Sequence, residues 1–418
     1  MKITEIYNIF QKHQNICTDT RKIKKYSLFF ALKGEKFNGN KFAKQAIKEG
    51  CSFAIIDEKK YDTSNKYILV DNVLETLQEL ARHHRKHISI PIIGITGTNG
   101  KTTSKELIHA VLGAELNCYA TKGNLNNHIG VPLSILEINN THKIAIIEMG
   151  ANHKKEIQFL CNIARPTHAV ITNIGTAHLE GFKNIQTIID TKNEIYEYIA
   201  KEQGIVFVNS NDKLLLNLST SMNRLTYGEN GSCKGNIINN TPYISIKYKN
   251  IDIKSKLIGE YQFSNIMLAV CIGKQFNIKD EKIKNAIESY FPKNNRSEIL
   301  KTKNNTLILD AYNANPSSMK AMLNSFAQQN YTNKLCILGD MLELGVYAES
   351  EHTAILELIE ELDLKAFLIG KEFSRISKQA FKDKIKFIKF LESYPIQNKT
   401  ILLKGSRGIS LEKLTKHL

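Results

Sequence analysis

Long apolar runs and a secretory leader are both missing from this sequence. A membrane-spanning helix needs about 18 consecutive apolar residues, and no stretch of the chain approaches that length. The first residues, MKITEIYNIFQKHQ, are too polar for a secretory signal. We therefore expect a cytoplasmic protein with no membrane insertion.

The seven cysteines also lack a recognisable pattern. They are odd in number, scattered between Cys17 and Cys336, and include no C-x-x-C pair. This argues against a disulfide framework or a zinc site and favours free thiols in a reducing compartment. The sequence also lacks internal repeats of 20–50 residues, which argues against a repeat architecture. It contains no low-complexity linker.

The charge is unbalanced, but it lacks the clustering of a nucleic-acid binder. The formal net charge is +16, from 57 Lys and Arg against 41 Asp and Glu. Such an excess can indicate a nucleic-acid partner. Here the basic residues are mostly lysines spread along the whole chain, without a dense block interleaved with aromatic residues. We expect no nucleic-acid partner, and an anionic small-molecule substrate explains local positive charge better.

What is present is the pattern of an α/β protein. At roughly 100–200 residues per domain, 418 residues predict two to four domains. Apolar strands alternate with helices, which is typical of parallel sheets covered on both faces. We predict three domains: a small N-terminal α/β domain over residues 1–86, a central domain with a parallel sheet over 87–296, and a C-terminal Rossmann-like, doubly wound domain over 297–418.

The hydrophobic pattern places the individual elements within these domains. A turn-rich stretch at 228–257 predicts additional β structure in the central domain. Helices are expected at 42–48, 73–86, 101–112, 153–164, 184–200, 259–276 and 279–290. Strands are expected at 27–32, 52–57, 91–96, 143–149, 168–172, 204–208, 306–311, 334–338, 365–369, 385–390 and 400–403.

The stretch GITGTNGKTT, at residues 94–103, is the most informative motif. A β-branched strand runs into it and a helix follows Lys101, which is the context of a phosphate-binding loop. Its glycines let backbone N–H groups turn toward phosphate oxygens, and the N-terminus of the helix adds its dipole. Lys101 can reach the terminal phosphates, and the Thr102 hydroxyl can bind Mg²⁺. Ile95 replaces a glycine of the common G-x-x-x-x-G-K-[ST] pattern, so the loop is a variant.

The variant loop TGTNGKTT resembles the ATP loop of the Mur ligase family, the ATP-dependent amide ligases of peptidoglycan precursor synthesis. The N-terminal CTDTRKI and LFFALKGEKFNGNKFA, with GNLNNHIGVPLSIL, are similar to the family member that adds a D-alanyl-D-alanine dipeptide. Together the matches cover nearly the whole chain. Further stretches that resemble the family, in the same order, are IEMGANHKKEI (147–157), TNIGTAHLEGF (172–182), DTKNEIY (190–196), NRSE (295–298), DAYNANPSSM (310–319), LGDMLELG (338–345) and LLKGSRG (402–408).

The resemblance implies an ATP-dependent ligase that adds D-Ala-D-Ala to UDP-N-acetylmuramoyl-tripeptide through an acyl phosphate. The substrate carboxylate attacks the γ-phosphate of ATP, and the amine then displaces phosphate. Both reactants of the first step are anions, so a cation must screen them, and Mg²⁺ does so effectively. We expect ATP, two Mg²⁺ ions and a monomer, with the last domain closing over the reactants to exclude water.

Four residues are implied at the metal ions: Thr102, Glu148, His178 and Lys192. From its own context, Glu148 can also be a solvated acid at a strand end, and the context of His178 alone favours a structural histidine. Lys192, taken from its residues alone, is a surface lysine on a helix. The resemblance instead implies a CO₂-derived carbamate on Lys192, whose negative charge binds the second Mg²⁺. Lys101, His178, Lys192 and Arg296 are the implied catalytic residues.

The resemblance also implies contacts to the nucleotide. Asn265 should contact adenine, although Tyr261-Gln262 departs from the H-N or Y-N that the family often has. Asp310 should bind ribose, with Tyr312 beside the base. Lys404 and Arg407 either belong to the site or are plain surface charges. The phosphates should meet Gly97, Thr98, Asn99, Gly100, Lys101, Thr102, Thr103 and Arg296.

The remaining implied residues concern the other two substrates. N-A-N-P at 313–316 stands where the ligase that adds diaminopimelate or lysine typically has D-N-P-[RK], and it supplies Asn313 and Asn315. Asn124, Asn126 and Asn127 fall where the substrate crosses toward ATP. The implied UDP-sugar site comprises Thr20, Arg21, Lys33, Gly34 and Asn40.

Three alternatives remain. A folylpolyglutamate synthase shares the loop and the carbamylated lysine, but not the N-terminal domain or DAYNANP. A nucleic-acid-dependent P-loop ATPase is favoured only by the net charge. A catalytically inactive homologue is disfavoured because Lys101, Glu148, His178 and Lys192 are all present.

Overall fold

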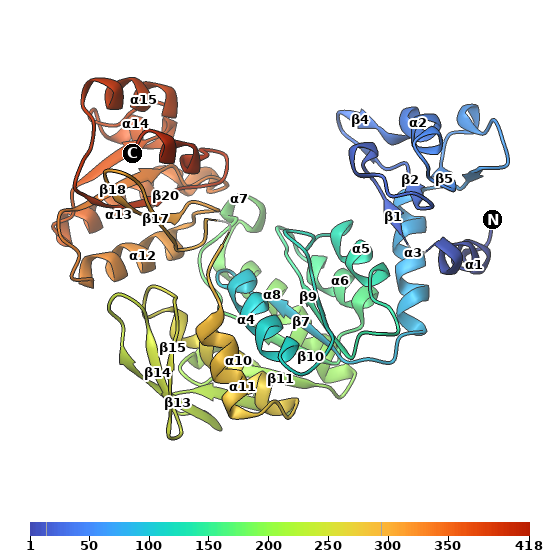
Figure 1. The fold of residues 1–418 in the computed structure, drawn as a ribbon, viewed down its shortest axis with the longest axis horizontal. Helices are drawn as coiled ribbons and strands as arrows, with labels where there is room; N and C mark the ends of the chain where they lie inside the picture. The colour runs from blue at the N-terminus through green and yellow to red at the C-terminus, as the bar shows by residue number, and fades with distance from the viewer. Residues whose placement is uncertain (14, 294) are drawn as a thin grey trace.

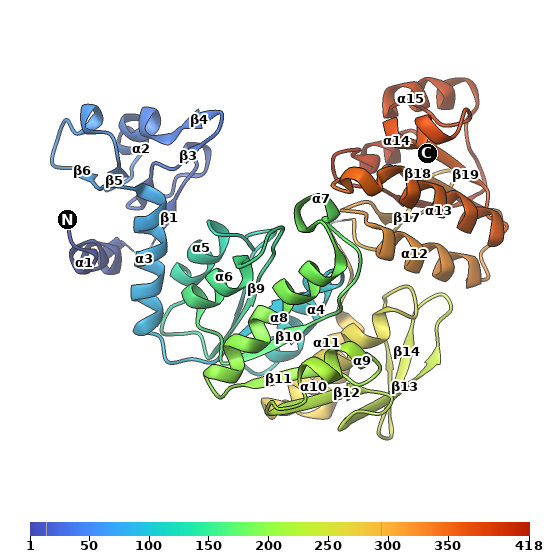
Figure 2. The ribbon, with the colours of Figure 1, turned by 180° about the vertical axis from the view of Figure 1, so that it is seen from behind.

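The computed structural model describes residues 1–13, 15–293 and 295–418 (Figure 1). Its three large sheets form an N-terminal, a central and a C-terminal part, and each predicted domain range contains one of them. The N-terminal and C-terminal parts lie at opposite ends of the molecule, joined by the central part, and Figure 2 shows the same arrangement from behind. The predicted three-domain α/β class is confirmed, whereas the domain boundaries stay predictions.

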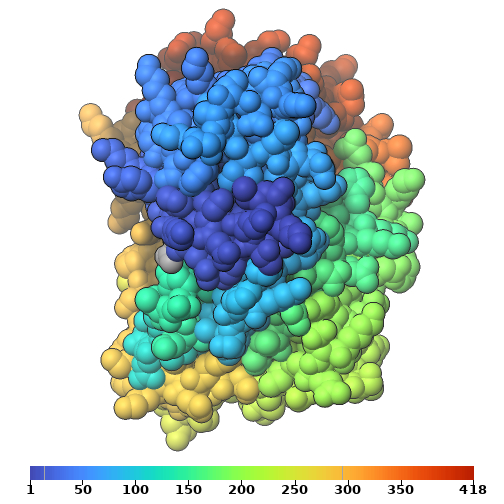
Figure 3. Space-filling model, turned by 90° about the vertical axis from the view of Figure 1, so that its right-hand side faces the viewer, coloured from blue at the N-terminus to red at the C-terminus, as the bar shows by residue number. Residues whose placement is uncertain are grey.

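The N-terminal part contains a parallel sheet in the order β1-β2-β5-β6 and a small β3–β4 ribbon. The first helix was not predicted; it buries Ile6, Tyr7 and Phe10 and packs on the helix α3. Figure 3 shows the first residues, in dark blue, on the outer face of this part. The elements are α1 (Ile3–His13), β1 (Ile16–Cys17), η1 (Thr20–Lys22), β2 (Leu28–Phe30), β3 (Lys33–Gly34), β4 (Phe37–Asn38), η2 (Gly39–Phe42), α2 (Ala43–Lys48), β5 (Phe53–Ile56), η3 (Lys59–Tyr61), β6 (Tyr67–Leu69) and α3 (Val73–Lys86).

The central sheet has the order β15-β14-β13-β12-β11-β10-β7-β9-β8. Neighbouring strands are parallel from β8 to β13. The stretch from β13 to β15 is antiparallel and forms the β structure predicted at 228–257. The strands are β7 (Ile92–Thr96), β8 (Cys118–Ala120), β9 (Ile144–Glu148), β10 (His168–Ile171), β11 (Ile205–Asn209), β12 (Arg224–Gly228), β13 (Cys233–Asn239), β14 (Ser245–Tyr248) and β15 (Ile251–Lys254).

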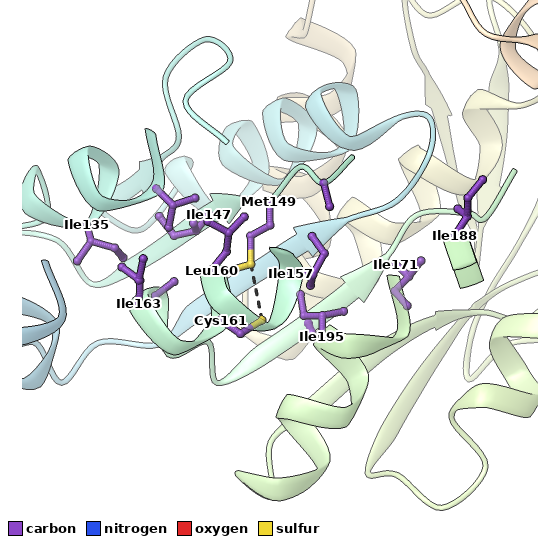
Figure 4. Packing of buried hydrophobic residues seen from close by; sticks show 14 of the residues in the cluster. Ile135, Ile147, Met149, Ile157, Leu160, Cys161, Ile163, Ile171, Ile188 and Ile195 are labelled. Atoms are coloured by element: carbon purple, nitrogen blue, oxygen red, sulfur yellow. Dashed lines mark hydrogen bonds between the residues drawn. The ribbon is translucent and has the colours of Figure 1, made fainter. Parts of the chain in front are cut away.

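Helices cover both faces of this sheet, because its parallel strands are apolar on both sides. On one face Ile147 and Ile171 pack with Leu160 and Ile195 of α6 and α8 (Figure 4). On the other face the buried core includes Ile93 and helices α4 and α10. The helices are α4 (Lys101–Gly113), α5 (Gly130–Leu136), α6 (Glu156–Ala164), α7 (Leu179–Phe182), α8 (Ile185–Lys201), α9 (Lys213–Leu218), α10 (Gln262–Gln275) and α11 (Asp280–Ser289).

The strand order reverses at β7, which lies between β9 and β10. Ligands of open α/β sheets bind at the carboxyl ends of the strands, at such a reversal. Ile95 pairs with Glu148 at the end of β9, and Thr96 pairs with Ile171 at the end of β10. The loop after β7 and the Glu148 carboxylate therefore share one edge of the sheet.

The C-terminal sheet has the order β16-β17-β20-β18-β19, parallel except for the edge strand β16. It is the second doubly wound sheet that the sequence predicted. Across the described chain, none of the helices combines the length and the apolar character needed to span a membrane. The C-terminal elements are β16 (Glu298–Lys301), β17 (Thr306–Asp310), α12 (Pro316–Gln328), β18 (Lys334–Gly339), η4 (Gly345–Tyr347), α13 (Ala348–Glu361), β19 (Ala366–Ile369), α14 (Lys371–Ile376), α15 (Lys384–Ser393), β20 (Thr400–Lys404) and η5 (Leu411–Lys416).

One predicted strand was wrong, because residues 385–390 lie in the helix α15. The alternation of lysine with isoleucine and phenylalanine imitates a half-buried strand. In the structure, Asp383 caps the helix by accepting from Lys386 N at 2.9 Å. Phe387 and Leu391, four residues apart, are buried together, as expected for one face of a helix.

Candidate active site

The phosphate-loop sequence forms a tight turn between β7 and α4. Gly97 and Gly100 have φ values of +142° and +77°, where a side chain would be strained. A Cβ on Gly97 would lie 2.0 Å from Thr172 Oγ1, and a Cβ on Gly100 would lie 2.8 Å from Asn265 Oδ1. Glycine is therefore required at both positions, and α4 begins at Lys101 directly after the turn.

Residues that follow β10 hold this turn in place. The Thr172 hydroxyl and the Asn173 side-chain amide donate to the Asn99 carbonyl at 2.6 and 3.0 Å. Asn99 N donates to Asn173 Oδ1 at 3.0 Å. Gly175 N donates to Thr98 Oγ1 at 3.0 Å. The loop is thus fixed by its neighbours in the same part of the chain.

Lys101 curls back over the loop. Its Nζ donates to the carbonyl oxygens of Gly97 at 2.5 Å and Thr98 at 3.0 Å. Burial lowers the pKa of Lys101 to about 8; Arg296 lowers it further, while Glu148 opposes the shift. A lysine held at this position can donate a charge-assisted hydrogen bond to an anion bound against the loop.

Glu148 is 1% exposed, and both of its carboxylate oxygens are engaged. Oε2 accepts from Thr102 Oγ1 at 3.0 Å, and Oε1 accepts from Asn126 Nδ2 at 2.9 Å. Lys105 Nζ lies 3.5 Å from Oε2. The burial excludes the interpretation of Glu148 as a solvated acid. Instead, the carboxylate faces the hydroxyl that directly follows the loop lysine.

Thr102 and Glu148 offer oxygen ligands, which Mg²⁺ prefers. Mg²⁺ usually takes one or two protein ligands and completes its shell with phosphates and water. In the described residues, no group of three or more His, Cys, Asp or Glu side chains is arranged to hold a metal ion. The pair therefore fits a Mg²⁺ ion that brings phosphate and water ligands, and not an ion held by protein alone.

Lys192 lies inside the protein and not on the surface, at 3% exposed. Its Nζ is 5.7 Å from the centre of the Phe182 ring, and within the described parts of the chain this ammonium has no hydrogen-bond or ion-pair partner. Burial, followed by the charge of Lys101, lowers the pKa of Lys192 to about 7, although Glu156 and Glu194 oppose the shift. Burial thus disfavours the charged ammonium form of this lysine.

His178 joins the central part to the C-terminal part. Its Nδ1 shares a hydrogen bond with Glu343 Oε2, and this bond holds the pKa of the Glu343 carboxyl below its usual value. Nearby, Glu180 N donates to Glu343 O at 3.2 Å, and Tyr347 OH donates to Lys183 O at 3.2 Å. The α7 segment thus docks on the loop that leads into η4.

A second junction joins the phosphate loop directly to α12. Asn315 Nδ2 donates to Asn99 Oδ1 at 2.8 Å, and Asn99 Nδ2 donates to Ser317 Oγ at 2.9 Å. Asn315 is also the N-cap of α12, where its Oδ1 accepts from Ser318 N at 2.8 Å. One asparagine therefore both starts a C-terminal helix and contacts the loop.

Asn265 lies behind the loop, at 6% exposed. Its Oδ1 accepts from Ser104 Oγ at 2.8 Å, and its Nδ2 donates to Gln262 Oε1 at 2.7 Å. The Arg296 guanidinium lies 3.6 Å from the centre of the Tyr312 ring, in the geometry of a cation–π contact. These side chains line the same space from both sides of the junction between the two parts.

Asp310 and Lys404 form a buried ion pair at the ends of β17 and β20. Asp310 Oδ1 also accepts from Ser297 N at 3.2 Å. Lys404 is 2% exposed, so its interpretation as a plain surface charge was wrong. Arg407 is exposed and donates to Tyr312 OH at 3.4 Å.

A cavity of about 900 Å³ opens between the central and C-terminal parts. Its size is within the range of small-molecule sites. Every residue predicted to bind the nucleotide or a metal ion, or to act in catalysis, lines this cavity. The predicted substrate residues of the central and C-terminal parts line it as well. These are Gly97, Thr98, Asn99, Gly100, Lys101, Thr102, Thr103, Asn124, Asn126, Asn127, Glu148, His178, Lys192, Asn265, Arg296, Asp310, Tyr312, Asn313 and Asn315.

The five predicted UDP-sugar residues lie in the N-terminal part and do not line this cavity. Arg21 and Lys33 are exposed but paired with acidic neighbours. Asn40 is 0% exposed; it donates to Asp57 Oδ1 at 2.8 Å and accepts from Asp57 N at 3.0 Å. Thr20 lies in η1 and Gly34 in β3, both at least partly accessible.

The predicted set omitted Lys105, which pairs with Glu148, and also Ser317 and Glu343, which make contacts across the junction. Lys105 stands four residues after Lys101, so the helical period could have placed it on the same face of α4. Ser317 and Glu343 lie within stretches that resemble the family, DAYNANPSSM and LGDMLELG. Their contacts cross to another domain, and no local sequence signal indicates such contacts.

Comparison with known proteins agrees with this architecture. Residues 12–85 match the Mur ligase family catalytic domain, residues 95–273 the Mur ligase middle domain, and residues 295–407 the Mur ligase glutamate ligase domain. A UDP-N-acetylmuramoyl-tripeptide–D-alanyl-D-alanine ligase of Bacillus subtilis is 34% identical, over 96% of this chain and 92% of its own. The chain belongs to the Mur ligase family.

Solved Mur ligase structures share the whole fold. A crystal structure of MurF from Acinetobacter baumannii superposes with a TM-score of 0.87 at 29% identity, covering 98% of this chain and 97% of that one. MurF from Thermotoga maritima in complex with ADP has a TM-score of 0.84 at 26% identity, with 97% of each chain covered. The similarity therefore extends over all three parts of this Mur ligase, and not only over its ATP loop.

Proposed function

We propose that this protein is the ATP-dependent ligase that joins D-Ala-D-Ala to UDP-N-acetylmuramoyl-tripeptide in peptidoglycan precursor synthesis. The observation that carries the proposal is the convergence of Lys101, Glu148 and Lys192 on one cavity, between the phosphate loop and the C-terminal part. The relative from Bacillus subtilis that bears this name aligns with 96% of the chain. We further propose that the protein acts as a monomer.

ATP would bind with its phosphates against the loop and the N-terminus of α4. Lys101 would leave the Gly97 and Thr98 carbonyls to donate to phosphate oxygens. Arg296, already at the cavity wall, would contact the γ-phosphate, and the Tyr312 ring would lie beside the base. Asn265 would contact adenine and Asp310 the ribose.

Thr102 and Glu148 would hold the first Mg²⁺, and His178 with a modified Lys192 the second. Bound Mg²⁺ screens the repulsion between the attacking carboxylate and the γ-phosphate. The ligand oxygens of Thr102 and Glu148 already lie 3.0 Å apart, so the chain does not need to rearrange to present them.

We infer that Lys192 carries a carbamate formed with CO₂. The neutral amine attacks carbon dioxide, an N–C bond forms, and the proton leaves to solvent. Burial without a hydrogen-bonded anionic partner keeps this amine partly neutral and leaves it free to react. The product replaces a buried cation with an anion that suits a divalent metal.

The chain orients two anionic reactants and keeps water away from the acyl phosphate. The substrate carboxylate attacks the γ-phosphorus, and the bond to the ADP oxygen breaks. The dipeptide amine then attacks the acyl carbon, and phosphate leaves. Asn124, Asn126 and Asn127 would guide the tripeptide from its UDP end in the N-terminal part, while Asn313 and Asn315, which also line the cavity, would face the dipeptide.

The test is a phosphate-release assay with UDP-N-acetylmuramoyl-tripeptide, ATP and D-Ala-D-Ala, in which each substrate is omitted in turn. We expect release only when all three are present. Turnover without the UDP-linked tripeptide, or with a folate in its place, contradicts the assignment and favours a folylpolyglutamate synthase. ATPase activity stimulated by a polyanion, without an amide product, favours the nucleic-acid-dependent ATPase.

A further inference from the structure

A second lysine of α4, one turn beyond the loop lysine, points at the Glu148 carboxylate. Lys105 is 3% exposed, and its Nζ lies 3.5 Å from Glu148 Oε2. Lys101 donates instead to loop carbonyls. Among the residues that the structure describes, Lys105 is the one cation that forms an ion pair with Glu148.

The remaining contacts of Glu148 are neutral. Thr102 Oγ1 and Asn126 Nδ2 donate at 3.0 and 2.9 Å, and Glu148 N donates to Thr121 Oγ1 at 3.0 Å. Taking a carboxylate out of water without a counter-charge is costly, and removing one partner of a buried ion pair is strongly destabilising. Lys105 is therefore the direct ion-pair partner of Glu148 inside the protein, while Lys101 interacts with the carboxylate from farther away.

We propose that Lys105 is a positioning residue whose ion pair holds the Glu148 carboxylate aimed at the loop, and that it keeps free Mg²⁺ from binding there before the nucleotide arrives. A divalent ion on Glu148 would lie within a few ångströms of the Lys105 ammonium and would be repelled by it. The phosphates of ATP bring the negative charge that overcomes this repulsion. This role in metal loading rests on the proposed function, whereas the ion pair and its contribution to stability do not.

The first experiment is thermal unfolding of Lys105→Met, which keeps the length of the side chain and removes its charge. We expect the Tm to fall by about 10 °C, because a buried carboxylate loses its partner. Lys105→Arg should retain most of the stability. Lys122→Met is the matched control, since Lys122 pairs with Glu137 at 68% and 43% side-chain exposure and such pairs contribute little.

The double variant Lys105→Met/Glu148→Gln shows whether Lys105 stabilises the protein through its charge or only through its packing. If the two charges stabilise each other, the double variant should recover most of the lost Tm. Recovery supports the proposal even if Lys105→Met alone does not fold. A double variant as unstable as the single one overturns it, because Lys105 would then act only through its packing.

The second experiment adds Mg²⁺ alone, without nucleotide, and follows Tm and calorimetric binding. We expect little effect on the wild type and binding roughly tenfold tighter or more in Lys105→Met, with part of its Tm restored. Equal Mg²⁺ responses in the two proteins overturn the metal-loading role. Neither experiment needs ligase activity, so a failed omission assay and a failed ion-pair test are distinguishable.

Discussion

The two walls of the cavity are built differently. On the central wall, Glu148 and Lys192 are at most 3% exposed. The phosphate loop on this wall is held by hydrogen bonds to other residues of the central part. The contacts that cross to the C-terminal wall use more accessible groups, as in His178 and Glu343 at 30% and 56% side-chain exposure. The central wall is thus preorganised, whereas the exposed contacts that cross the junction are expected to contribute less to stability.

Because of this difference, we expect substitutions on the two walls to have different effects. Loss of a buried central charge should reduce the chemical step, because electrostatic stabilisation in a water-poor site is worth several kcal/mol. Loss of a crossing hydrogen bond should mainly weaken the contact between the central and C-terminal parts. Four substitutions test this contrast, from the largest expected effect to the smallest.

The largest effect is expected for Lys101→Ala, on the central wall. The lost charge-assisted contact should cost on the order of 3 kcal/mol, or about 100-fold or more in kcat/KM. Circular dichroism should show an intact fold. Lys122→Ala, at an exposed lysine, should be near wild type. A loss below tenfold for Lys101→Ala would show that the loop is not the ATP site.

Lys192→Arg should reduce kcat by roughly 10–100-fold at fixed Mg²⁺, because arginine keeps the positive charge but cannot carry a carbamate. Lys192→Ala should be equally impaired, and added acetate should restore part of its activity by placing an anion in the vacated space. Lys201→Arg, at an exposed position of the same helix, is the matched control. Near wild-type activity of Lys192→Arg rejects the carbamate.

Asn315→Ser probes the junction, since serine can still cap α12 but cannot reach Asn99. One lost hydrogen bond of about 1 kcal/mol predicts a roughly fivefold rise in KM for ATP, with kcat changed less. Asn315→Ala loses the cap as well and should also lower the Tm. If Asn315→Ser reduces kcat as strongly as Lys101→Ala, the contrast between the two walls is wrong.

The smallest effect is expected for Glu343→Gln, which removes the charge but leaves an oxygen that accepts a hydrogen bond. A partly exposed ion pair contributes about 0.2–1 kcal/mol, so steady-state kinetics should change by about twofold. The effect should shrink at high salt, because exposed charges are screened. An effect above tenfold would place Glu343 within the catalytic machinery.

Buried strands were the most predictable elements. The runs at 91–96 and 143–149 are apolar on both faces, and the structure forms β7 and β9 there. The loop could also be predicted, because its strand, glycines and helix are contiguous. By contrast, α15 carries a strand-like alternation, and only its cap and the burial of Phe387 with Leu391 reveal a helix.

Pairings between distant residues could not be predicted from local pattern. Asn99 and Asn315 are bonded across 216 positions of sequence, and Thr102 meets Glu148 across 46. The family resemblance predicted that Glu148 and Lys192 belong to the site, but it predicted no role for Lys105. Burial distinguishes Lys192 from an ordinary surface lysine of a helix and lowers its pKa, and burial depends on the packing of α8 against the sheet.

The central claim is that this cavity activates a substrate carboxylate with ATP. The most direct measurement uses UDP-N-acetylmuramoyl-tripeptide labelled with ¹⁸O in its terminal carboxylate. Attack on the γ-phosphorus forms a bond between the labelled oxygen and phosphorus, and displacement by the dipeptide amine then leaves that oxygen on phosphate. The account predicts one ¹⁸O atom in the inorganic phosphate for each amide bond formed. Amide product with unlabelled phosphate would contradict it.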